Sequence, residues 1–536
     1  MIKNKPATIA CLLVALVTFL VFIPALSGDF IIQDDSAYII ANPLIRQLDW
    51  HSIGLAFTRA HIGWWMPLTW LSFAVDYHFW GLNPFGYHLV NIILHALNAC
   101  LVVLIADQLC RERIRGIAEP AQTDWHYAGF LVFAGLLFGL HPLRVESVAW
   151  VVERKDVLNG LLAFSSIYFY LQYARIKDCG GRAGGYYFAA LLLFAMSLMA
   201  KSASVGLSLM LLVLDWFPLG RVGRRGIKPV LLEKLPFFVV SALGAGVALY
   251  VARDSSYLVT YEAFPFSQRL VVSGNAIWEY WRMFFLPLGM SPLHVIPDPI
   301  PDSYVLKAAV VALLLIAIFC TRRLRWLQAT TLCFILPVFP VLGFFQNGDQ
   351  AFAARFTYLA AVAQTITLAA LLFGAAIVGE GKALRRAKVI TAVVLLAGSV
   401  CVTHSLFPVW RNTESYWTRI IQIEPLAINY KERGRHYFTN GRYEAAVDDF
   451  SAALEKVTET LKPYEYNLYG YRGEALRMAG RYEEAVRDFT AAIAGLPHPA
   501  YFYHRGLALK SLGRFTEAEQ DFRRSGPNPG QISWYE

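Results

Sequence analysis

The sequence predicts an all-α protein in which a polytopic membrane helical bundle precedes a C-terminal α-solenoid. Of the 536 residues, 56% are hydrophobic and only 16% are charged, and the mean hydropathy is +0.43, well above that of an ordinary soluble domain. After Trp410 the composition becomes charged and alanine-rich, and an internal repeat begins. We therefore expect a transmembrane domain over residues 1–410 and a repeat domain over residues 411–536.

Basic clusters predict the number and direction of the membrane spans, because Lys and Arg are enriched in cytoplasmic loops. About eleven spans place every cluster on the cytoplasmic side. A further hydrophobic run at 268–290 would move the last two clusters outside if it spanned, and Trp278, Trp281 and Arg282 favour an interfacial or re-entrant helix there. An odd count leaves the C-terminus on the outer face. The predicted spans are 8–26, 86–109, 128–141, 157–174, 186–200, 203–218, 229–252, 304–320, 326–344, 356–378 and 388–405.

Charge and cysteine placement limit the chemistry that we expect. The net charge of +9 lies in short clusters between hydrophobic runs, which indicates topology and not nucleic-acid binding. All seven cysteines lie in or beside hydrophobic runs without a C-x-x-C pair, so we expect no disulfide framework and no zinc site. The first apolar run, Ile9 to Ile23, has two readings, a cleavable signal peptide or an uncleaved anchor, and its length favours the anchor.

The C-terminal region contains three similar units. A Gly-Arg-aromatic motif recurs at Gly441, Gly480 and Gly513, each time between an Arg-Gly pair and an Asp-Phe pair. The interval is close to the 34-residue tetratricopeptide period, with a small insertion near Lys462. We expect two helices per unit, with repeats near 427–460, 464–497 and 498–530. Such an array binds a peptide or protein, or it caps the membrane domain.

A pair of carboxylates follows the first span, in the stretch FIIQDDSAYIIANP. Asp34 and Asp35 point to opposite sides if this loop is extended, so we expect them to have different roles. At a lipid surface a carboxylate is partly desolvated and, here, lies beside a like charge, and both effects raise its pKa toward that of a useful general base. An Asp-Asp pair by itself is also typical of a helix or turn cap.

Other polar residues are predicted on the same side of the membrane. His88 and His95 lie on one face of an otherwise apolar span, where polar side chains are functional candidates or hydrogen-bonded packing residues. His141 and Glu146 lie in a predicted outer loop, and Lys201 falls where two spans meet. These residues place several cations and carboxylates near one membrane face.

The stretches HPLRVESVAWVVERKDVL, NPFGYHLVNIILHALNA and SLMAKSASV, together with the Asp-Asp loop and the repeats, resemble the transmembrane and tetratricopeptide-repeat protein family, including its bacterial members. These proteins are O-mannosyltransferase relatives with a C-type glycosyltransferase fold. The chain departs from the family pattern at Met66, where an Arg is frequent, and at Ala354, where an acidic residue is frequent. These departures bear on substrate identity more than on fold.

The resemblance implies a membrane glycosyltransferase that moves a sugar, such as the hexose mannose, from a polyprenyl-phosphate donor to a hydroxyl, in particular Ser or Thr of an exported protein. It does not firmly imply any cofactor beyond the polyprenyl-phosphate-sugar donor substrate, and dependence on a divalent metal stays open. Phosphate is already a good leaving group, so the site needs a base and fixed cations. The candidates are Asp34, Asp35 and Glu146 for catalysis, with Asp34 as the base; Lys201, Arg355 and Arg154 for the donor phosphate; and His141, His88 and His95 for orienting the acceptor or the loop.

Alternatives remain at this point. The acceptor is a protein that the repeats present, or else an envelope lipid or polysaccharide. A non-catalytic repeat scaffold or a lipid transporter is the alternative outside enzymes. We expect an integral protein of the bacterial inner (plasma) membrane, surrounded by membrane lipids, with the active site and repeats on the periplasmic face and no nucleic-acid partner.

Overall fold

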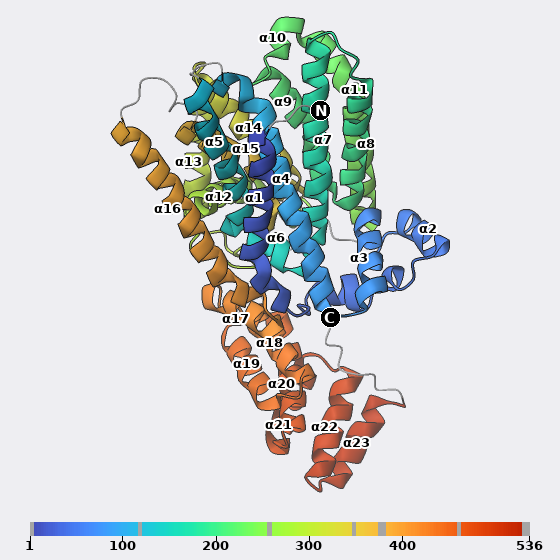
Figure 1. Ribbon diagram of the computed structural model, residues 1–536. Helices are drawn as coiled ribbons and strands as arrows, with labels where there is room; N and C mark the ends of the chain where they lie inside the picture. Colours follow the sequence, from blue (N-terminus) through green and yellow to red (C-terminus); the bar gives the residue numbers. More distant parts are fainter. Residues whose placement is uncertain are drawn as a thin grey trace. The chain divides into compact units, whose positions relative to one another are not determined.

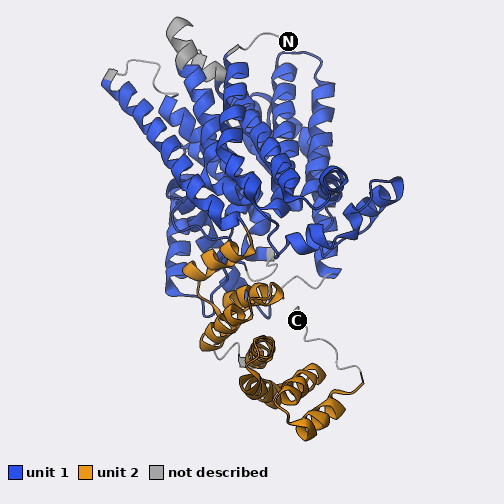
Figure 2. Cartoon of the chain, turned by 60° about the horizontal axis from the view of Figure 1, so that its bottom comes forward, with its two compact units in different colours: residues 1–411 blue, residues 412–536 orange. Residues whose placement is uncertain are grey.

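The computed structural model describes residues 5–115, 120–254, 260–345, 350–373, 382–457 and 462–527. The chain divides into two compact units, unit 1 (Met1–Arg411) and unit 2 (Asn412–Glu536), which Figure 2 distinguishes by colour. Both units are helical (Figure 1); within the described ranges the extended contacts are two isolated bridges, and no strand is formed. The predicted all-α class is confirmed.

Unit 1 contains long helices joined by short helices and turns. Its α-helices are α1 (Lys5–Phe22), α2 (Trp50–Thr58), α3 (Pro67–Trp80), α4 (Pro84–Arg115), α5 (Pro120–Leu140), α6 (Val145–Ala149), α7 (Arg154–Asp178), α8 (Gly184–Ala200), α9 (Leu207–Trp216), α10 (Arg221–Arg225), α11 (Ile227–Asp254), α12 (Phe266–Phe285), α13 (Asp302–Cys320), α14 (Arg325–Val338), α15 (Ala361–Phe373) and α16 (Lys382–Leu406). Short helices that carry polar residues of interest are η2 (Ser36–Ile40), η4 (Pro142–Arg144), η5 (Val151–Glu153), η6 (Ser202–Gly206) and η9 (Ala354–Thr357).

The centre of unit 1 is the contact between α1, α4 and α5. Glycines of α5 allow this close approach. A Cβ atom on Gly135 would lie 2.5 Å from Val103 of α4, and one on Gly139 would lie 2.4 Å from the Thr18 hydroxyl of α1. Small residues at helix interfaces are typical of membrane bundles, because lipid supplies no hydrophobic force between helices and close packing must supply the attraction.

Five helices among the described residues are long and apolar enough to cross a membrane, and a sixth span is possible if one bent pair counts as a single span. The bent pair, His126–Leu140 with Pro142–Ala149, turns by 50° at its break. The five segments are Pro6–Ser27, Pro84–Cys110, Ile227–Asp254, Asp302–Cys320 and Ala383–Trp410.

The remaining predicted spans correspond to other kinds of helix. Those near 186–200, 203–218, 326–344 and 356–378 fall on apolar helices of 10–17 residues. The predicted span 157–174 falls on α7, which is long enough but has charged residues at both ends and several polar side chains between them. Short or polar helices cross a membrane only inside a bundle, where neighbours satisfy their polar groups. The count of eleven therefore stays a prediction.

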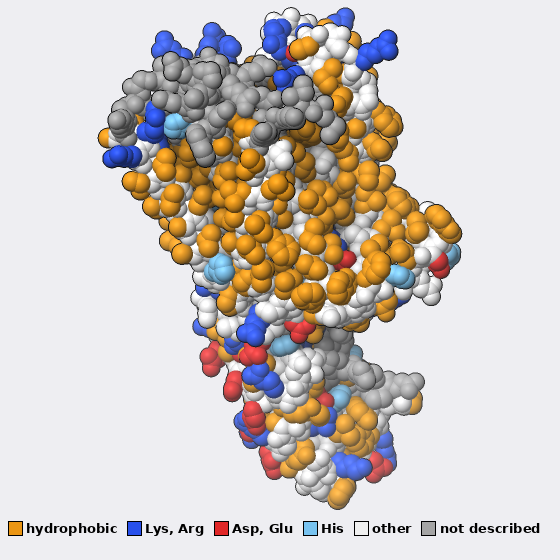
Figure 3. Space-filling model, viewed as in Figure 1, with side chains coloured by type: hydrophobic (Ala, Val, Ile, Leu, Met, Phe, Trp, Pro, Cys, Tyr) orange, Lys and Arg blue, Asp and Glu red, His pale blue; other side chains and the backbone are white. Residues whose placement is uncertain are grey.

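The outer helices of unit 1 expose a continuous apolar surface, which is unfavourable in water. On α13 only 6% of the apolar stretch is buried, and Leu306, Leu313 and Ile316 are exposed. Hydrophobic side chains cover most of the face of unit 1 seen in Figure 3. An apolar surface of this extent indicates contact with lipid. Unit 1 is thus an integral membrane unit.

The run near 268–290 forms α12, which is not among the five candidate spans. Its buried face includes Val272, Ala276 and Tyr280, and Gly274 contacts α13 so closely that a Cβ atom would lie 2.6 Å from Ala308. Phe266 and Phe285 at its two ends are exposed. An interfacial or re-entrant placement stays the prediction for this helix.

Unit 2 consists of α17 (Thr413–Ile423) followed by three helical hairpins, which are α18 (Ala427–Thr439) with α19 (Tyr443–Glu455), α20 (Lys462–Met478) with α21 (Tyr482–Gly495), and α22 (Pro499–Ser511) with α23 (Phe515–Ser525). Gly441, Gly480 and Gly513 turn between the two helices of each hairpin with φ of 73°, 80° and 76°. Glycine adopts this left-handed conformation without steric cost. The end of the first repeat, 458–460, and the end of the third, 528–530, lie outside the described residues.

One polar contact recurs in every hairpin of unit 2. An Arg of the first helix forms a two-pronged ion pair with an Asp sixteen positions later, and a further nitrogen of its guanidinium donates to a hydroxyl of the helix that precedes the hairpin. The ion pairs are Arg433 with Asp449, Arg472 with Asp488 and Arg505 with Asp521. The hydroxyls are those of Thr418, Ser451 and Thr490. Because Thr418 lies on α17, this helix occupies the position of a preceding second helix and covers the end of the array.

We expect Arg472→Ala to loosen the middle of unit 2. The change removes both hydrogen bonds to Asp488, at 2.7 and 2.9 Å, and leaves that carboxylate mostly buried without its partner. A cost of about 2 kcal/mol corresponds to roughly 30-fold faster amide exchange in α20 and α21. Hydrogen exchange on the full chain measures this. Arg487→Ala is the control, since Arg487 is exposed and lies 3.9 Å from Glu484; equal effects of the two changes would contradict the structural role of Arg472.

Candidate active site

A break in the α5–α6 helical segment brings carboxylates to one end of the bundle. Pro142 begins η4, and His141 caps it by accepting a hydrogen bond from the Leu143 N–H at 3.2 Å. The other ring nitrogen of His141 donates to the Phe284 carbonyl at 2.9 Å. Because proline cannot continue the preceding helix, the chain turns here and directs α6 and η5 across the bundle. His141 therefore orients the loop that carries Glu146 and Glu153.

Glu153 lies at the centre of a group of cations. One of its carboxylate oxygens, Oε1, lies 3.1 Å from Lys155 Nζ and 3.4 Å from Arg355 Nε. The other oxygen lies 3.5 Å from Lys201 Nζ. Glu153 is fully buried, whereas the three cationic side chains keep 11–13% of their surface exposed. The arrangement fixes three positive charges around one carboxylate with their outer sides open.

Two further carboxylates hold these cations in place. Glu146 accepts hydrogen bonds from both the backbone N–H and the guanidinium of Arg355. Asp156 pairs with Lys201 at 2.5 Å, so α6 and α7 each contribute one anchor. The contacts of Lys201 and Arg355 with Glu153 are longer than an ordinary N–H···O hydrogen bond, so part of their donor capacity is left for another acceptor.

Aromatic rings line the same cluster. The Lys155 ammonium lies 4.7 Å from the centre of the Tyr38 ring, and the Arg355 guanidinium lies 4.9 Å from that of Phe356 and 5.4 Å from that of Trp150. Such rings stabilise cations electrostatically while excluding water. A narrow pocket beside the cluster is lined in part by Lys201, Arg355 and Phe356.

Asp34 and Asp35 have the different surroundings that their adjacency predicts. Asp35 is fully buried, and its two oxygens accept the backbone N–H groups of Ile31 at 2.8 Å and of Val152 at 3.0 Å. Asp34 is half-buried, and its carboxylate has no hydrogen bond or ion pair with any residue that the structure describes. Asp35 thus ties the loop to η5, next to Glu153, while Asp34 is the carboxylate left unengaged.

The pKa directions follow from these surroundings. Burial raises the pKa of Asp34, against the lowering effect of Lys155 and Arg355, and Glu153 raises it further. Burial also raises the pKa of Asp35 to about 8, although its two backbone hydrogen bonds favour the charged form. Burial opposes the charge on Glu153 too, but Lys155, Lys201 and Arg355 together lower its pKa. Asp34 lies in the loop that its neighbour Asp35 attaches to η5, the short helix that ends at Glu153.

The structure brings Asp34, Glu146, Lys201 and Arg355 together, but it separates Arg154 from them. Arg154 is fully buried and donates to Asp76 at 2.6 Å, to the Tyr87 carbonyl at 2.9 Å and to Asn91. Its donors are therefore occupied by α3 and α4. These contacts favour a structural role for Arg154, and its predicted contact with the donor phosphate stays an untested prediction.

We expect Arg154→Lys to lower the melting temperature without changing the Michaelis constant for a phosphate-linked donor. Lysine keeps the charge opposite Asp76 but loses the planar fork that reaches Asn91 and the Tyr87 carbonyl, at a cost of about 2 kcal/mol. Thermal unfolding and initial rates on the purified chain measure the two quantities. A raised Michaelis constant with unchanged stability would instead indicate a phosphate-binding role.

The other predicted histidines are also engaged in packing. The Nε2–H of His95 donates to the Gly139 carbonyl at 2.9 Å, and its Nδ1 accepts from the Tyr358 hydroxyl at 2.8 Å. His88 is buried against the start of the first loop, where a Cβ atom on Gly28 would lie 2.9 Å from its ring. Both rings thus support the packing of α4, and their predicted role in orienting the acceptor or the loop stays an untested prediction.

Three residues of the cluster were not among the predicted site residues: Glu153, Lys155 and Asp156. All belong to the stretch ERKD at the η5–α7 junction, whose density of charge is the only sequence signal for them. Consecutive residues of a helix point in directions about 100° apart, so the sequence alone does not say whether Arg154 or Lys155 faces the site. Among the described residues, no group of three or more His, Cys, Asp or Glu is placed to hold a metal ion.

A family model described as Tetratricopeptide repeat matches residues 431–497 and 472–532, in agreement with the hairpins of unit 2. The chain is also similar to several proteins named protein O-mannosyl-transferase. Its identity to TMTC2 of Mus musculus is 27% over 222 residues, which cover 40% of this chain and 24% of that protein. With TMTC1 of Homo sapiens the identity is 31% over 213 residues, 36% of this chain and 22% of that protein.

The chain is similar over a longer region to the protein O-mannosyl-transferase Tmtc2 of Drosophila melanogaster. The identity is 28% over 305 residues, which cover 52% of this chain and 31% of that protein. These similarities confirm the resemblance to the transmembrane and tetratricopeptide-repeat proteins that the sequence motifs indicated. The matched region spans about a quarter of the length of the first two relatives and less than a third of the third.

Proposed function

We propose that this chain is a membrane glycosyltransferase that moves a hexose, such as mannose, from a polyprenyl-phosphate donor to a hydroxyl of a Ser or Thr side chain in a protein. The observation that carries the proposal is the half-buried carboxylate of Asp34, which has no hydrogen bond or ion pair with a described residue and lies in the loop that Asp35 attaches to η5, where three cations surround Glu153. A base beside fixed positive charge suits a reaction whose leaving group is a phosphate. The names of the similar proteins support the same reaction class.

In the proposed reaction the acceptor oxygen attacks the anomeric carbon and its proton passes to Asp34. The bond from that carbon to the phosphate oxygen breaks as the new glycosidic bond forms, and the phosphate leaves with the electron pair. Lys155, Lys201 and Arg355 stabilise the charge that develops on the phosphate, because they are held in place before the reaction begins. Direct displacement inverts the configuration at the anomeric carbon.

The carboxylates of the cluster have supporting roles in this proposal. Glu146, Glu153 and Asp156 balance the three cations in the absence of substrate. The donor phosphate then takes the donors of Lys201 and Arg355 that Glu153 engages only at 3.4–3.5 Å. Asp35 is a positioning residue in this proposal, because its hydrogen bonds from the backbone N–H groups of Ile31 and Val152 hold the loop with Asp34 next to η5. No step requires a metal ion or a cofactor other than the lipid-linked donor.

The remaining assignments concern location and partners. We place the site on the outer face of the membrane, which is the periplasmic face of a bacterial inner membrane. The basic clusters lie in the loops of the opposite face, which is then the cytoplasmic face. The repeats of unit 2 are proposed to bind the acceptor protein, since helical-repeat arrays present extended surfaces to peptides.

A donor-turnover assay tests the proposal. Purified full-length chain receives polyprenyl-phosphate mannose with a radiolabelled sugar and a membrane-protein extract, and label is counted in protein and in lipid. Label in Ser- or Thr-containing peptides supports the proposal, whereas label in lipid alone would redirect it to a lipid or polysaccharide acceptor. No transfer from mannose, glucose or N-acetylhexosamine donors by folded protein would favour a scaffold or lipid transporter, in which the repeats carry the function.

A further inference from the structure

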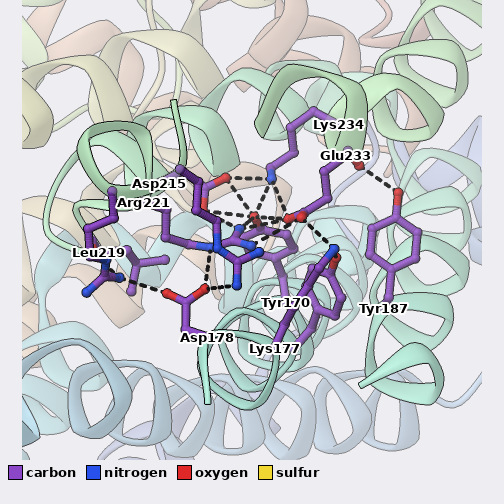
Figure 4. A network of polar contacts seen from close by, with 12 residues as sticks. Tyr170, Lys177, Asp178, Tyr187, Asp215, Leu219, Arg221, Glu233 and Lys234 are labelled. Atoms are coloured by element: carbon purple, nitrogen blue, oxygen red, sulfur yellow. Dashed lines mark hydrogen bonds and ion pairs between the residues drawn. The ribbon is translucent and has the colours of Figure 1, made fainter. Parts of the chain in front are cut away.

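A second polar cluster, which we call the α10 network, lies in unit 1 outside the candidate active site (Figure 4). Its buried centre consists of Tyr170, Asp215, Arg221 and Lys234. The guanidinium of Arg221 lies 2.9 Å from an Asp215 oxygen and 2.7 Å from the Tyr170 hydroxyl, and Lys234 lies 2.5 Å from the other Asp215 oxygen. The cluster thereby ties α7, α9, α10 and α11 together.

The outer part of the α10 network is rich in positive charge. Lys177, Arg224 and Arg225 surround Glu233 and Asp178: Lys177 lies 3.0 Å from Glu233, and Arg224 and Arg225 lie 2.7 and 2.6 Å from Asp178. The whole network holds five cations (Lys177, Arg221, Arg224, Arg225 and Lys234) against three carboxylates (Asp178, Asp215 and Glu233). Two positive charges are therefore uncompensated, and they lie on the exposed side of the network.

A pocket of ≈ 670 Å³ opens beside this excess charge. Helices α7, α8 and α11 and the end of α10 form its walls, and both Lys177 and Arg225 line it. Their side chains are 43% and 28% exposed. The carboxylate of Glu233 is also in the wall, but Arg221 and Lys177 already neutralise it. Lys177 and Arg225 thus line the pocket with positive charge while each is also paired with a carboxylate of the network, which as a whole has two more cations than carboxylates.

The other walls of the pocket are small or aromatic. Gly181, Ala183 and Gly184 line one side, and Tyr173 and Tyr187 line another. Tyr187 donates its hydroxyl hydrogen to the Glu233 carbonyl at 2.7 Å, which fixes its ring. Tyrosine rings with one polar end are enriched where a membrane meets water. The lining is therefore suited to a molecule that is charged at one end and apolar at the other.

The helices that form the pocket also carry exposed apolar surface. On α11 Ile227 and Leu232 are 50% and 62% exposed, and on α8 Phe188 is 66% exposed. Figure 3 shows Lys and Arg side chains at the α10 end of unit 1 and a hydrophobic surface over the helices. The pocket therefore lies beside both charged and apolar surface, an arrangement that suits the headgroup level of a lipid leaflet.

From this geometry we propose that the pocket between α7, α8 and α11 binds the phosphate headgroup of an anionic phospholipid from the surrounding leaflet. Lys177 and Arg225 bind the phosphate by charge-assisted hydrogen bonds, and the acyl chains lie along the apolar surface of α8 and α11. The clusters at 175–182 and 221–228 that supply the charge are those that the sequence places in the cytoplasm, the side on which anionic lipids concentrate. The proposal is independent of the reaction assigned to the candidate active site.

Native mass spectrometry of the detergent-purified full chain tests the proposal with phosphatidylglycerol, phosphatidylcholine and inorganic phosphate as probes. We expect a retained phosphatidylglycerol adduct and at least about tenfold weaker binding of net-neutral phosphatidylcholine. Inorganic phosphate at millimolar concentration should leave the lipid adduct in place, because it lacks the acyl contacts. Equal binding of the two lipids, or displacement by inorganic phosphate, would overturn the proposal.

Two variants and a matched control locate the site. Arg225→Gln should weaken phosphatidylglycerol binding about tenfold, whereas Arg224→Gln should change it less than about twofold. Both residues pair with Asp178 and both changes remove one charge, but only Arg225 lines the pocket. Gly184→Phe fills the pocket without changing charge, in a position where an added Cβ meets nothing within 4 Å. Equal losses at Arg224 and Arg225, or retained binding in Gly184→Phe, would contradict the assignment; melting temperatures without lipid verify that each variant is folded.

Discussion

In the Asp34→Asn variant we expect sugar transfer to fall by about 10²–10⁴-fold while the melting temperature stays that of the unmodified chain. The rate falls because asparagine cannot take the proton of the acceptor hydroxyl. The stability is unaffected because the Asp34 carboxylate has no hydrogen bond or ion pair with a described residue. Turnover and thermal unfolding of the same preparations measure both quantities.

The pH dependence of the rate identifies Asp34 in a second way. Only the ionised carboxylate accepts a proton, so the rate should rise with pH through the pKa of Asp34. Burial raises that pKa above the ordinary aspartate value, although Lys155 and Arg355 lower it in part. The rising limb of kcat/KM therefore lies at higher pH than an exposed aspartate would give, and this limb should be absent from the residual rate of Asp34→Asn.

Asp29→Asn is the matched control for this experiment. Asp29 lies in the same loop, is exposed, and bonds the neighbouring Phe30 N–H. Its substitution should leave the rate within about twofold, since an exposed side chain away from special contacts has a small effect. Transfer at the unmodified rate in Asp34→Asn would show that another group is the base, and an equal loss in Asp29→Asn would attribute the effect to the loop.

The second large effect is expected in Glu153→Gln, which should lower the free energy of unfolding by about 3–5 kcal/mol. Glutamine has nearly the same shape but no charge, so Lys155, Lys201 and Arg355 lose the carboxylate that they share. Glu146 and Asp156 still pair with two of these cations, but the mutual repulsion of three nearly buried positive charges then has no central counter-ion. Thermal unfolding in detergent at neutral pH measures the loss.

The dependence of stability on acidic pH tests the same role of Glu153. The folded-state pKa of Glu153 is lowered from the ordinary glutamate value of 4.5. Its contribution is therefore fully present above about pH 4.5 and is lost as the pH falls toward the lowered pKa, so Glu153→Gln should flatten this part of the stability curve. Glu279→Gln is the control, since its partners Arg282 and Lys307 are 30% and 31% exposed and stay hydrated. Equal losses in both variants, or none in Glu153→Gln, would remove Glu153 from the centre of the cluster.

Much of the architecture was predictable from composition and period. The hydrophobic content predicts a membrane bundle, and the recurring Gly-Arg-aromatic motif predicts the hairpins of unit 2. The sequence also places Asp34, Lys201 and Arg355 among the polar candidates of one membrane face, and the structure brings them near one another. The number of spans was less predictable, because α8, α9, α14 and α15 are too short to be told from buried helices by hydropathy alone.

The roles within the charged stretch ERKD were not predictable. Arg154 and Lys155 are neighbours of the same charge, yet one pairs with Asp76 and the other with Glu153. Asp76 is 78 positions before Arg154, so only the tertiary structure decides this pairing. The same limit applies to Asp35, whose bond to the Val152 N–H spans 117 positions and so could not be predicted from the sequence.

The hydroxyl contacts in unit 2 hold each hairpin in register with the helix before it, whatever the length of chain between them. In two cases the Arg and the hydroxyl are 15 positions apart, but between Ser451 and Arg472 the separation is 21. Part of the extra length lies in α20 itself, which begins at Lys462, farther before its Arg than α18 and α22 begin before theirs. The contact nevertheless stays at 3.1 Å, within 0.1 Å of the others. The spatial register of successive helices in unit 2 is therefore kept although the length of chain between the Arg and the hydroxyl differs.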